Sequence, residues 1–419
     1  MKAVPESTLP LYNEQNVAEL QRFFGLELAA KTAEECVQKT VELANNHDGN
    51  DVRVDDMDRG GVTYFQLKHR KSGEAHESCN GDAGSPAPVN SEEANSSPRE
   101  RYHVGSWFWY CVFSFGAALG DDLFYFFVFP FAIANMSWWV IRRLLMVWGF
   151  CMFIGQASKE ILQWPRPSEP PVIRLEKRYF KEYGMPSTHA MVGTLVPFTL
   201  LVSTWNHYEY PHMLGIVLAC NWTLLVCCSR LYRGMHFILD IVAGVTLTCL
   251  LMALIWPWLD MLDHFQLTHP YAPVIIITVT LLLCILYPAL DGVGATRKDT
   301  ISILGAMAGG SSAFWFNYHN GILPDADGPL GGVIMWPDMP TAGIMFVKYA
   351  LVKVCAIILF FGTKFLVKKF FYYVVGIEVN EETKKLLIVQ IPYGYIPHWL
   401  TMIIGFQLGP WIYRWLGLE

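Results

Sequence analysis

The chain has 419 residues, of which 53% are hydrophobic, 14% aromatic and only 16% charged, and its mean hydropathy is +0.28. Soluble globular domains usually carry about 25% charged residues, so this composition excludes an ordinary soluble enzyme. Residues 1–104 hold 11 basic and 18 acidic side chains, whereas the 315 residues after them hold 20 and 19. No strongly basic domain remains, which excludes a nucleic-acid-binding protein that depends on bulk positive charge.

The first 104 residues form a polar tail. Five apolar residues recur at roughly helical spacing and predict a short amphipathic helix, namely Val17, Leu20, Phe23, Phe24 and Leu26. The rest of the tail is polar and ends in segments rich in serine and proline. Because such a composition cannot bury enough apolar area to order itself, we expect residues 1–104 to be mostly disordered.

From Ser106 onward the sequence is a series of apolar runs, each long enough to cross a hydrocarbon core of about 30 Å. The runs are continuously apolar and do not alternate, which argues against the strands of a membrane barrel. We therefore expect an all-α, polytopic helical membrane protein. The nine predicted transmembrane helices cover residues 109–134, 141–161, 189–205, 212–229, 236–257, 272–290, 301–318, 343–366 and 395–415.

A first polar cluster follows the second of these spans. Lys159 stands in the last turn of that span, and Arg166 lies seven residues later between Pro165 and Pro167. The prolines end the helix and hold Arg166 on an irregular loop, where its guanidinium and the lysine ammonium can converge on one anion. Taken alone, the cluster also fits a snorkelling lysine followed by a basic interfacial loop.

A second cluster, Pro186-Ser187-Thr188-His189, immediately precedes the third span. Backbone N–H groups at a helix N-terminus, together with the helix dipole, form a cradle for a phosphate or an oxyanion. Ser187 adds a hydroxyl donor, and His189 stands at the edge of the cradle. Taken alone, the segment also fits a simple helix cap with an interfacial histidine.

A third cluster joins the fourth and fifth spans and contains Arg230, His236 and Asp240. His236 and Asp240 are four residues apart, which predicts that they share one helical face within hydrogen-bonding reach. A carboxylate in that place fixes the imidazole tautomer and leaves the other ring nitrogen available as a nucleophile. The alternative, an incidental pair in a membrane helix, is weakened by the cost of burying Asp240 without a task.

Alternating helices bring all three clusters to the same side of the membrane. Three cations, a helix N-terminus, two histidines and a carboxylate then face one spot, which suits an anion with several oxygens and above all phosphate. His189, His236 and Asp240 also fit a zinc site, but the neighbouring cations would repel a divalent ion. No acidic cluster indicates a two-magnesium site, so we expect no metal and no other cofactor.

The three clusters together resemble the three-part signature of the type 2 phosphatidic acid phosphatase superfamily, which includes lipid phosphate phosphatases, glucose-6-phosphatases and vanadium haloperoxidases. Thr188 stands where the superfamily usually has glycine. This substitution and the residues that flank the first two clusters look like the sphingosine-1-phosphate phosphatases. The positions that match the superfamily signature are Lys159 with Arg166-Pro167, Pro186-Ser187 with His189, and Ser229-Arg230 with His236 and Asp240.

The resemblance implies a membrane phosphomonoesterase that removes phosphate from sphingosine 1-phosphate and its dihydro and phyto relatives without a metal ion. It implies that His236 forms a phosphohistidine, that Asp240 orients this ring, and that His189 first protonates the leaving alkoxide and then activates water. It also implies an endoplasmic reticulum membrane protein with a lumenal site. The residues that it implies for holding the phosphoryl oxygens are Lys159, Arg166, Ser187, Thr188 and Arg230.

The expected organisation is therefore a tail at 1–104, a phosphatase core at 105–260, and additional transmembrane helices of the same membrane domain at 261–419. The expected partners are the sphingoid base phosphate substrate and membrane lipids, with no nucleic acid. The last four spans contain no interpretable motif. Their role in a homodimer, in substrate access or in packing alone therefore stays open.

Sidedness rests on the distribution of basic residues. Arg142-Arg143 at the start of the second span predict a cytoplasmic end there and hence a lumenal active site. If nine spans are correct, lysines at 368, 369, 384 and 385 fall on the active-site side of the membrane. Either the count of spans or the rule that basic residues lie on the cytoplasmic side therefore fails for this segment. The link between the first two clusters carries basic residues that we interpret as a rim steering anionic head groups, namely Arg174, Lys177, Arg178 and Lys181.

Two other functions fit parts of the sequence. A broader lipid phosphate phosphatase or a sugar phosphatase would use the same site, because the clusters read only the phosphate. A transporter or a catalytically silent lipid-binding protein is favoured slightly by the lysines of the eighth span, because buried cations often mark a pathway. These lysines are Lys348, Lys353 and Lys364.

Overall fold

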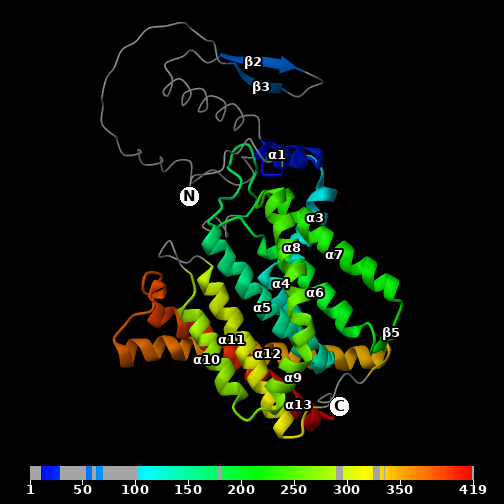
Figure 1. Ribbon diagram of the computed structural model, residues 1–419, viewed down its shortest axis with the longest axis vertical. Helices are drawn as coiled ribbons and strands as arrows, with labels where there is room; N and C mark the ends of the chain where they lie inside the picture. Colours follow the sequence, from blue (N-terminus) through cyan, green and yellow to red (C-terminus); the bar gives the residue numbers. More distant parts are fainter. Residues whose placement is uncertain are drawn as a thin grey trace.

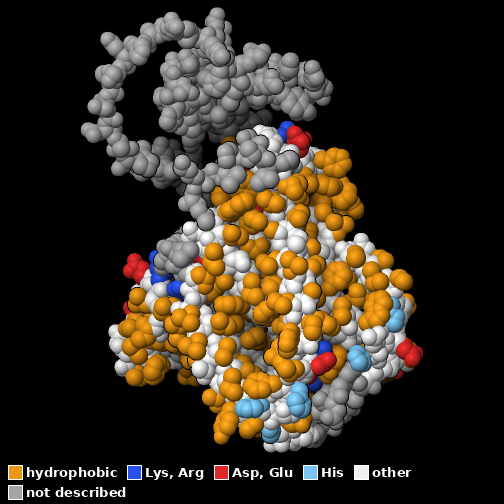
Figure 2. Space-filling view, in the orientation of Figure 1, with side chains coloured by type: hydrophobic (Ala, Val, Ile, Leu, Met, Phe, Trp, Pro, Cys, Tyr) orange, Lys and Arg blue, Asp and Glu red, His pale blue; other side chains and the backbone are white. Residues whose placement is uncertain are grey.

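The computed structural model describes residues 11–28, 53–58, 63–68, 102–176, 182–288, 296–323, 331–334 and 336–417. The helices gather in one body, and hydrophobic side chains cover most of the face shown in Figure 2. The helices, labelled in Figure 1, are α1 (Glu14–Phe23), α3 (Trp107–Leu119), α4 (Asp122–Asn135), α5 (Trp138–Leu162), α6 (Thr188–Thr204), α7 (His212–Tyr232), α8 (Ile238–Ile255), α9 (Leu259–Thr268), α10 (Ala272–Ile285), α11 (Arg297–His319), α12 (Met339–Phe370) and α13 (Leu387–Leu416).

The described strands are short and form three two-stranded sheets. The antiparallel pairs are β1 (Leu26–Leu28) with β4 (Tyr102–Val104) and β2 (Arg53–Asp58) with β3 (Thr63–Lys68), and the parallel pair is β5 (Tyr208–Glu209) with β6 (Gly332–Val333). Three further turns are helical: 3₁₀ turns at Trp256–Trp258 and Thr383–Lys385 and a π turn at Phe371–Val375.

The expected all-α membrane fold is confirmed, but the count of nine spans is not. Within the described ranges, α6 and α10 are shorter apolar helices, and α3 and α4 form a bent pair with an angle of 56° that gives a sixth span if it is counted as one. The five helical segments that are long and apolar enough to cross a membrane are Trp138–Leu162, His212–Tyr232, Ile238–Thr268, Met339–Val375 and Leu387–Tyr413.

The ends of α5, α6 and α7 place the three polar clusters. α5 ends at Leu162 because Gln163 adopts a left-handed conformation with φ 53° and prolines follow. Ser187 caps α6, and its side chain accepts a hydrogen bond from the Ala190 N–H. After α7 the chain turns through Gly234, whose φ of +66° favours glycine. Each cluster therefore lies on irregular backbone at the end of a helix.

The N-terminal helix α1 lies on the loops that follow α5 and α7. Gln21 is buried, and its amide bridges both loops by donating to the carbonyls of Ile173 and Tyr232 at 2.7 and 2.8 Å and accepting from the Ile173 N–H at 2.9 Å. Val17 and Ala18 pack with Val172 and Phe237. These contacts connect residues of the tail to the two loops that carry Arg166 and His236.

Arg142 and Arg143 do not lie in a connecting loop. Both are buried in the first turns of α5, where Arg142 donates to both carboxylate oxygens of Asp263 at 2.9 and 3.1 Å and Arg143 pairs with Asp260. Because α9 neutralises both cations inside the protein, they are weak markers of the cytoplasmic side. The lumenal orientation of the site consequently stays a prediction.

The C-terminal helices pack on the core through close backbone contacts. A Cβ at Gly305 of α11 would stand 2.7 Å from the Tyr395 carbonyl oxygen of α13, so glycine is needed for this approach. The start of α11 is held by the buried Glu160 of α5, which accepts from the backbone N–H and the hydroxyl of Thr296 at 3.1 and 2.6 Å. α11 is thereby fixed next to the end of α5 that carries Lys159.

Candidate active site

The second and third clusters are joined through their backbones. The Ser187 N–H donates to the Asp240 carbonyl oxygen at 3.0 Å, which ties the start of α6 to the first turn of α8. Gly244, one turn further along α8, allows this approach, because a Cβ there would lie 2.7 Å from the Ser187 carbonyl oxygen. The two helices therefore begin side by side, and Thr188 and His189, both buried in the first turn of α6, lie at the same end of the bundle as Asp240.

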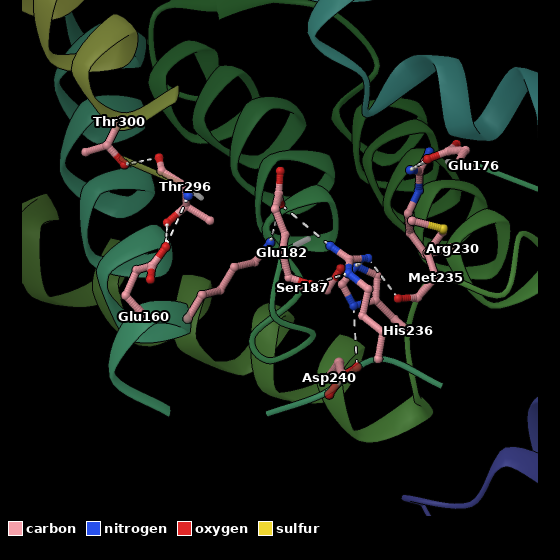
Figure 3. Close-up of polar contacts among 12 residues, drawn as sticks. Glu160, Glu176, Glu182, Ser187, Arg230, Met235, His236, Asp240, Thr296 and Thr300 are labelled. Carbon is pink, nitrogen blue, oxygen red and sulfur yellow. Dashed lines mark hydrogen bonds and ion pairs between the residues drawn. The ribbon is translucent and has the colours of Figure 1, made fainter. Parts of the chain in front are cut away.

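His236 and Asp240 form the pair that their spacing predicts. His236 Nδ1 lies 3.4 Å from Asp240 Oδ2, and neither side chain is exposed to solvent. The same carboxylate oxygen accepts the Phe237 N–H at 2.9 Å, which fixes its position at the start of α8. The prediction that the two residues share a helical face is wrong, because α8 begins at Ile238 and His236 lies on the turn before it. The imidazole thus faces the carboxylate with Nδ1 and turns Nε2 toward Arg166 (Figure 3).

Arg166 connects the first cluster to the third. Its Nη1 donates to the Met235 carbonyl oxygen at 2.9 Å and lies 3.4 Å from His236 Nε2, while its Nε donates to the Glu182 carbonyl oxygen at 2.9 Å. The side chain is 3% exposed. The guanidinium is therefore held rigidly beside the ring nitrogen that would attack a phosphorus atom.

Lys159 and Arg166 converge on one carboxylate. Glu182 Oε2 lies 3.3 Å from Lys159 Nζ and 3.6 Å from Arg166 Nη2. Lys159 is completely buried in the last turn of α5, so its ammonium does not snorkel to the membrane surface. An anionic group thus already occupies the place between these two cations, one of which, Arg166, also contacts His236.

Arg230 takes part in a separate ion pair. It is almost fully buried at the end of α7, where Nη1 lies 3.3 Å from Glu176 Oε2 and Nη2 donates to the Ala117 carbonyl oxygen at 2.8 Å. Glu176 also contacts Arg233 Nε at 2.6 Å. Figure 3 shows Arg230 extended toward Glu176, so the structure does not bring its guanidinium onto the carboxylate that Lys159 and Arg166 share.

Burial and neighbouring cations hold the pKa of His236 well below its usual value of 6.5. Burial is the larger cause, and the charges of Arg166, Lys159, His189 and Arg230 act in the same direction. The ring is consequently neutral near pH 7, as a nitrogen nucleophile must be. The same charges show that His189 and all three predicted cations lie within electrostatic range of this ring.

Glu182 and Glu176 are the site residues that sequence reasoning missed. Both lie in the linker between the first two clusters, and nothing in their local pattern distinguishes them from solvated acids of a loop. Of the predicted basic rim, Lys177, Arg178 and Lys181 fall outside the described residues. Arg174 is described, and its Nε donates to the Pro167 carbonyl oxygen at 2.8 Å.

Comparisons with known proteins identify the family of the chain. The family model described as the PAP2 superfamily matches residues 140–263. The chain is 37% identical to sphingosine-1-phosphate phosphatase 2 of Homo sapiens over 80% of this chain and 86% of that protein, and 34% identical to sphingosine-1-phosphate phosphatase 1 of Rattus norvegicus over 98% and 97%. It is 31% identical to lipid phosphate phosphatase delta of Arabidopsis thaliana over 35% of this chain and 38% of that protein. No solved structure matches the chain.

Proposed function

The chain belongs to the sphingosine-1-phosphate phosphatase family of the PAP2 superfamily, and from this premise we propose that it hydrolyses sphingoid base phosphates at the site between α5 and α8. The protein is a phosphoric monoester hydrolase in a multi-pass membrane domain. The observation that supports this placement of the site is the Glu182 carboxylate, an anion held by Lys159 and by Arg166, whose Nη1 lies 3.4 Å from His236 Nε2. A substrate phosphate would replace this carboxylate.

In the first step His236 Nε2 attacks the phosphorus atom while the bond to the lipid oxygen breaks. Asp240 holds the opposite side of the ring, which keeps the attacking nitrogen unprotonated and stabilises the positive charge that the ring gains. Lys159 and Arg166 neutralise charge on the equatorial oxygens, and Ser187 with the N–H groups of the α6 N-terminus adds donors. We place Thr188 in this cradle through its backbone N–H.

Both chemical steps need proton transfer, which we assign to His189. The alkoxide of a lipid alcohol is a poor leaving group, and a positioned acid typically contributes about 10² to 10⁴-fold in rate. His189 gives its proton to that oxygen, then removes a proton from water, whose oxygen attacks the phosphohistidine and releases inorganic phosphate. Arg230 contributes the field of its charge and reaches the phosphate only if it leaves Glu176.

A substrate panel on the purified protein in EDTA tests this function. We expect phosphate release from sphingosine 1-phosphate to exceed release from lysophosphatidate and glucose 6-phosphate, and to be unchanged by the chelator. His236→Ala should abolish release from all three. Equal rates on the three substrates would instead support the broader phosphatase, and lipid binding without turnover would support the silent lipid-binding protein.

We assign the protein to the endoplasmic reticulum membrane with the active site in the lumen, on the strength of the family resemblance. Ser168 is an exposed residue of the loop next to the site, so Ser168→Cys should react with a membrane-impermeant thiol reagent only after sealed microsomes are opened by detergent. The unsubstituted protein provides the background. Labelling of intact vesicles would place the site in the cytoplasm.

A homodimer and bound membrane lipids stay predictions. Measuring the mass of the purified protein tests the homodimer, and extracting its lipids tests lipid binding.

A further inference from the structure

A cavity of about 510 Å³ leads from the catalytic residues into the apolar body of the protein. It lies among α4, α5, α6, α11, α12 and α13, and its size is within the range of about 300 to 1,000 Å³ that is usual for ligand sites. At one end it is lined by Glu182, Thr188 and His189. Because Glu182 also contacts Lys159 and Arg166, the cavity adjoins the anion site.

The rest of the cavity is lined mainly by aromatic and aliphatic side chains. α5 contributes one face from Leu145 to Gln156, a helical rise of about 16 Å. α4 and α12 contribute aromatic and branched residues opposite it, among them Phe126, Phe129 and Val352. Polar side chains of α11 to α13, among them Lys298, Asp299 and Lys364, also line the cavity. Along its aromatic and aliphatic wall a hydrocarbon chain is favoured, because a polar ligand would lose hydration there without gaining partners.

The direction of the reaction points to the same occupant. In an in-line displacement the leaving oxygen departs opposite the nucleophile. Among the described residues that line the cavity, His189 is present and His236 is absent. The proposed general acid thus stands between the phosphate position and the cavity, where the oxygen that carries the lipid chain has to leave.

We propose that this cavity binds the hydrocarbon chain of the sphingoid base phosphate during catalysis. The inference rests on the proposed function and extends it, because much of the wall comes from α11, α12 and α13, outside the residues that match the PAP2 superfamily. The C-terminal helices thereby contribute to substrate selection, while the charged clusters bind only the head group.

Gly405 of α13 provides a sharp test. It is buried and lines the cavity, yet a Cβ built on it meets no heavy atom within 4 Å, so a larger side chain enters the cavity without striking the backbone. Replacing helical glycine also favours the helix. Gly362 of α12 is a matched control, because its Cβ likewise meets nothing but the residue is exposed and does not line the cavity.

We expect Gly405→Leu to lower kcat/KM for an 18-carbon sphingoid base phosphate by about 60-fold, because each methylene denied burial costs about fourfold and about three are displaced. A four-carbon analogue should be hydrolysed within twofold of the wild-type rate, and Gly362→Leu should alter neither substrate. An unchanged rate on the long chain, or an equal loss on both substrates in a folded variant, would overturn the proposal.

A second measurement does not depend on turnover. Full-length His236→Ala protein is photolabelled with a sphingoid base phosphate that carries a diazirine near the end of its chain. Label on the cavity segments of α4, α12 and α13, reduced by Gly405→Leu, is the expected result. Label confined to outward-facing residues such as those of α7 would overturn the chain site. Failure of wild-type protein to hydrolyse both the 18-carbon and the four-carbon substrate would overturn the proposed function. The position of the photolabel would still decide whether the cavity binds the hydrocarbon chain.

Discussion

The catalytic helices α5 to α8 and the C-terminal helices α11 to α13 treat their buried cations differently. In the first group Lys159 and Arg166 meet a carboxylate beside a neutral histidine. In the second group, the ammonium of Lys353 lies 3.1 Å from the centre of the Phe126 ring, and that of Lys364 lies 4.4 Å from the Phe360 ring. Cations on aromatic faces are satisfied without an anion. A lysine in a membrane helix therefore does not by itself indicate a transport pathway.

This difference predicts a large gap in activity between substitutions in the two regions. Asp240→Asn should lower kcat on sphingosine 1-phosphate by about 10³ to 10⁴-fold, because the amide no longer holds His236 in the reactive tautomer. Lys353→Met, in α12, should change kcat by less than about threefold. Steady-state assays in detergent with EDTA measure both. Comparable losses in the two folded variants would remove the distinction between the regions.

The carboxylate at the anion site offers a sharper comparison. Glu182 competes with phosphate for Lys159 and Arg166, and charge-assisted hydrogen bonds contribute about 1.5 to 3 kcal/mol each. We expect Glu182→Gln to strengthen inhibition by orthovanadate or phosphate by roughly tenfold. Glu381→Gln, which removes an exposed partner of Lys384 in the C-terminal half, should leave inhibition unchanged. Weaker inhibition of Glu182→Gln would show that this carboxylate supports the anion site.

The smallest expected effect concerns pH. The pKa of His236 is well below 6.5 in the folded protein, so the unfolded chain binds more protons below pH 6.5. The contribution of this ring to stability is therefore complete above pH 6.5 and is lost as the pH falls, by at most about 1.4 kcal/mol per pH unit. Thermal unfolding between pH 7.5 and 5 should show a smaller fall in Tm for His236→Asn than for wild type. Parallel curves would indicate that the pKa of this ring is the same in the folded and unfolded states, and would contradict the lowered pKa.

The helices and the three clusters could be predicted because they depend on local pattern. Continuous apolar runs indicated where helices lie, and the spacing of His236 and Asp240 predicted their contact, although His236 lies before α8 and not on a face of it. The shared side of the three clusters followed from helix alternation. The backbone bond from Ser187 to Asp240 agrees with that arrangement.

The remaining parts of the site depend on contacts between residues far apart in the sequence. Gln21 joins the loops at Ile173 and Tyr232 across 152 and 211 positions, and no local pattern marks it. Glu182 becomes a ligand of two cations only through the path of its loop. The cavity is a shape left among six helices, and its apolar lining residues look the same in sequence as any other buried apolar residue.

The most direct test of the account is to trap the covalent intermediate. Wild-type protein is mixed with ³²P-labelled sphingosine 1-phosphate, quenched within the first turnover, digested under alkaline conditions and sequenced. We predict an acid-labile, alkali-stable label on the peptide that contains His236, and no label on His236→Ala protein. Release of phosphate with no label on the protein, or a label on another residue, would contradict the proposed role of His236.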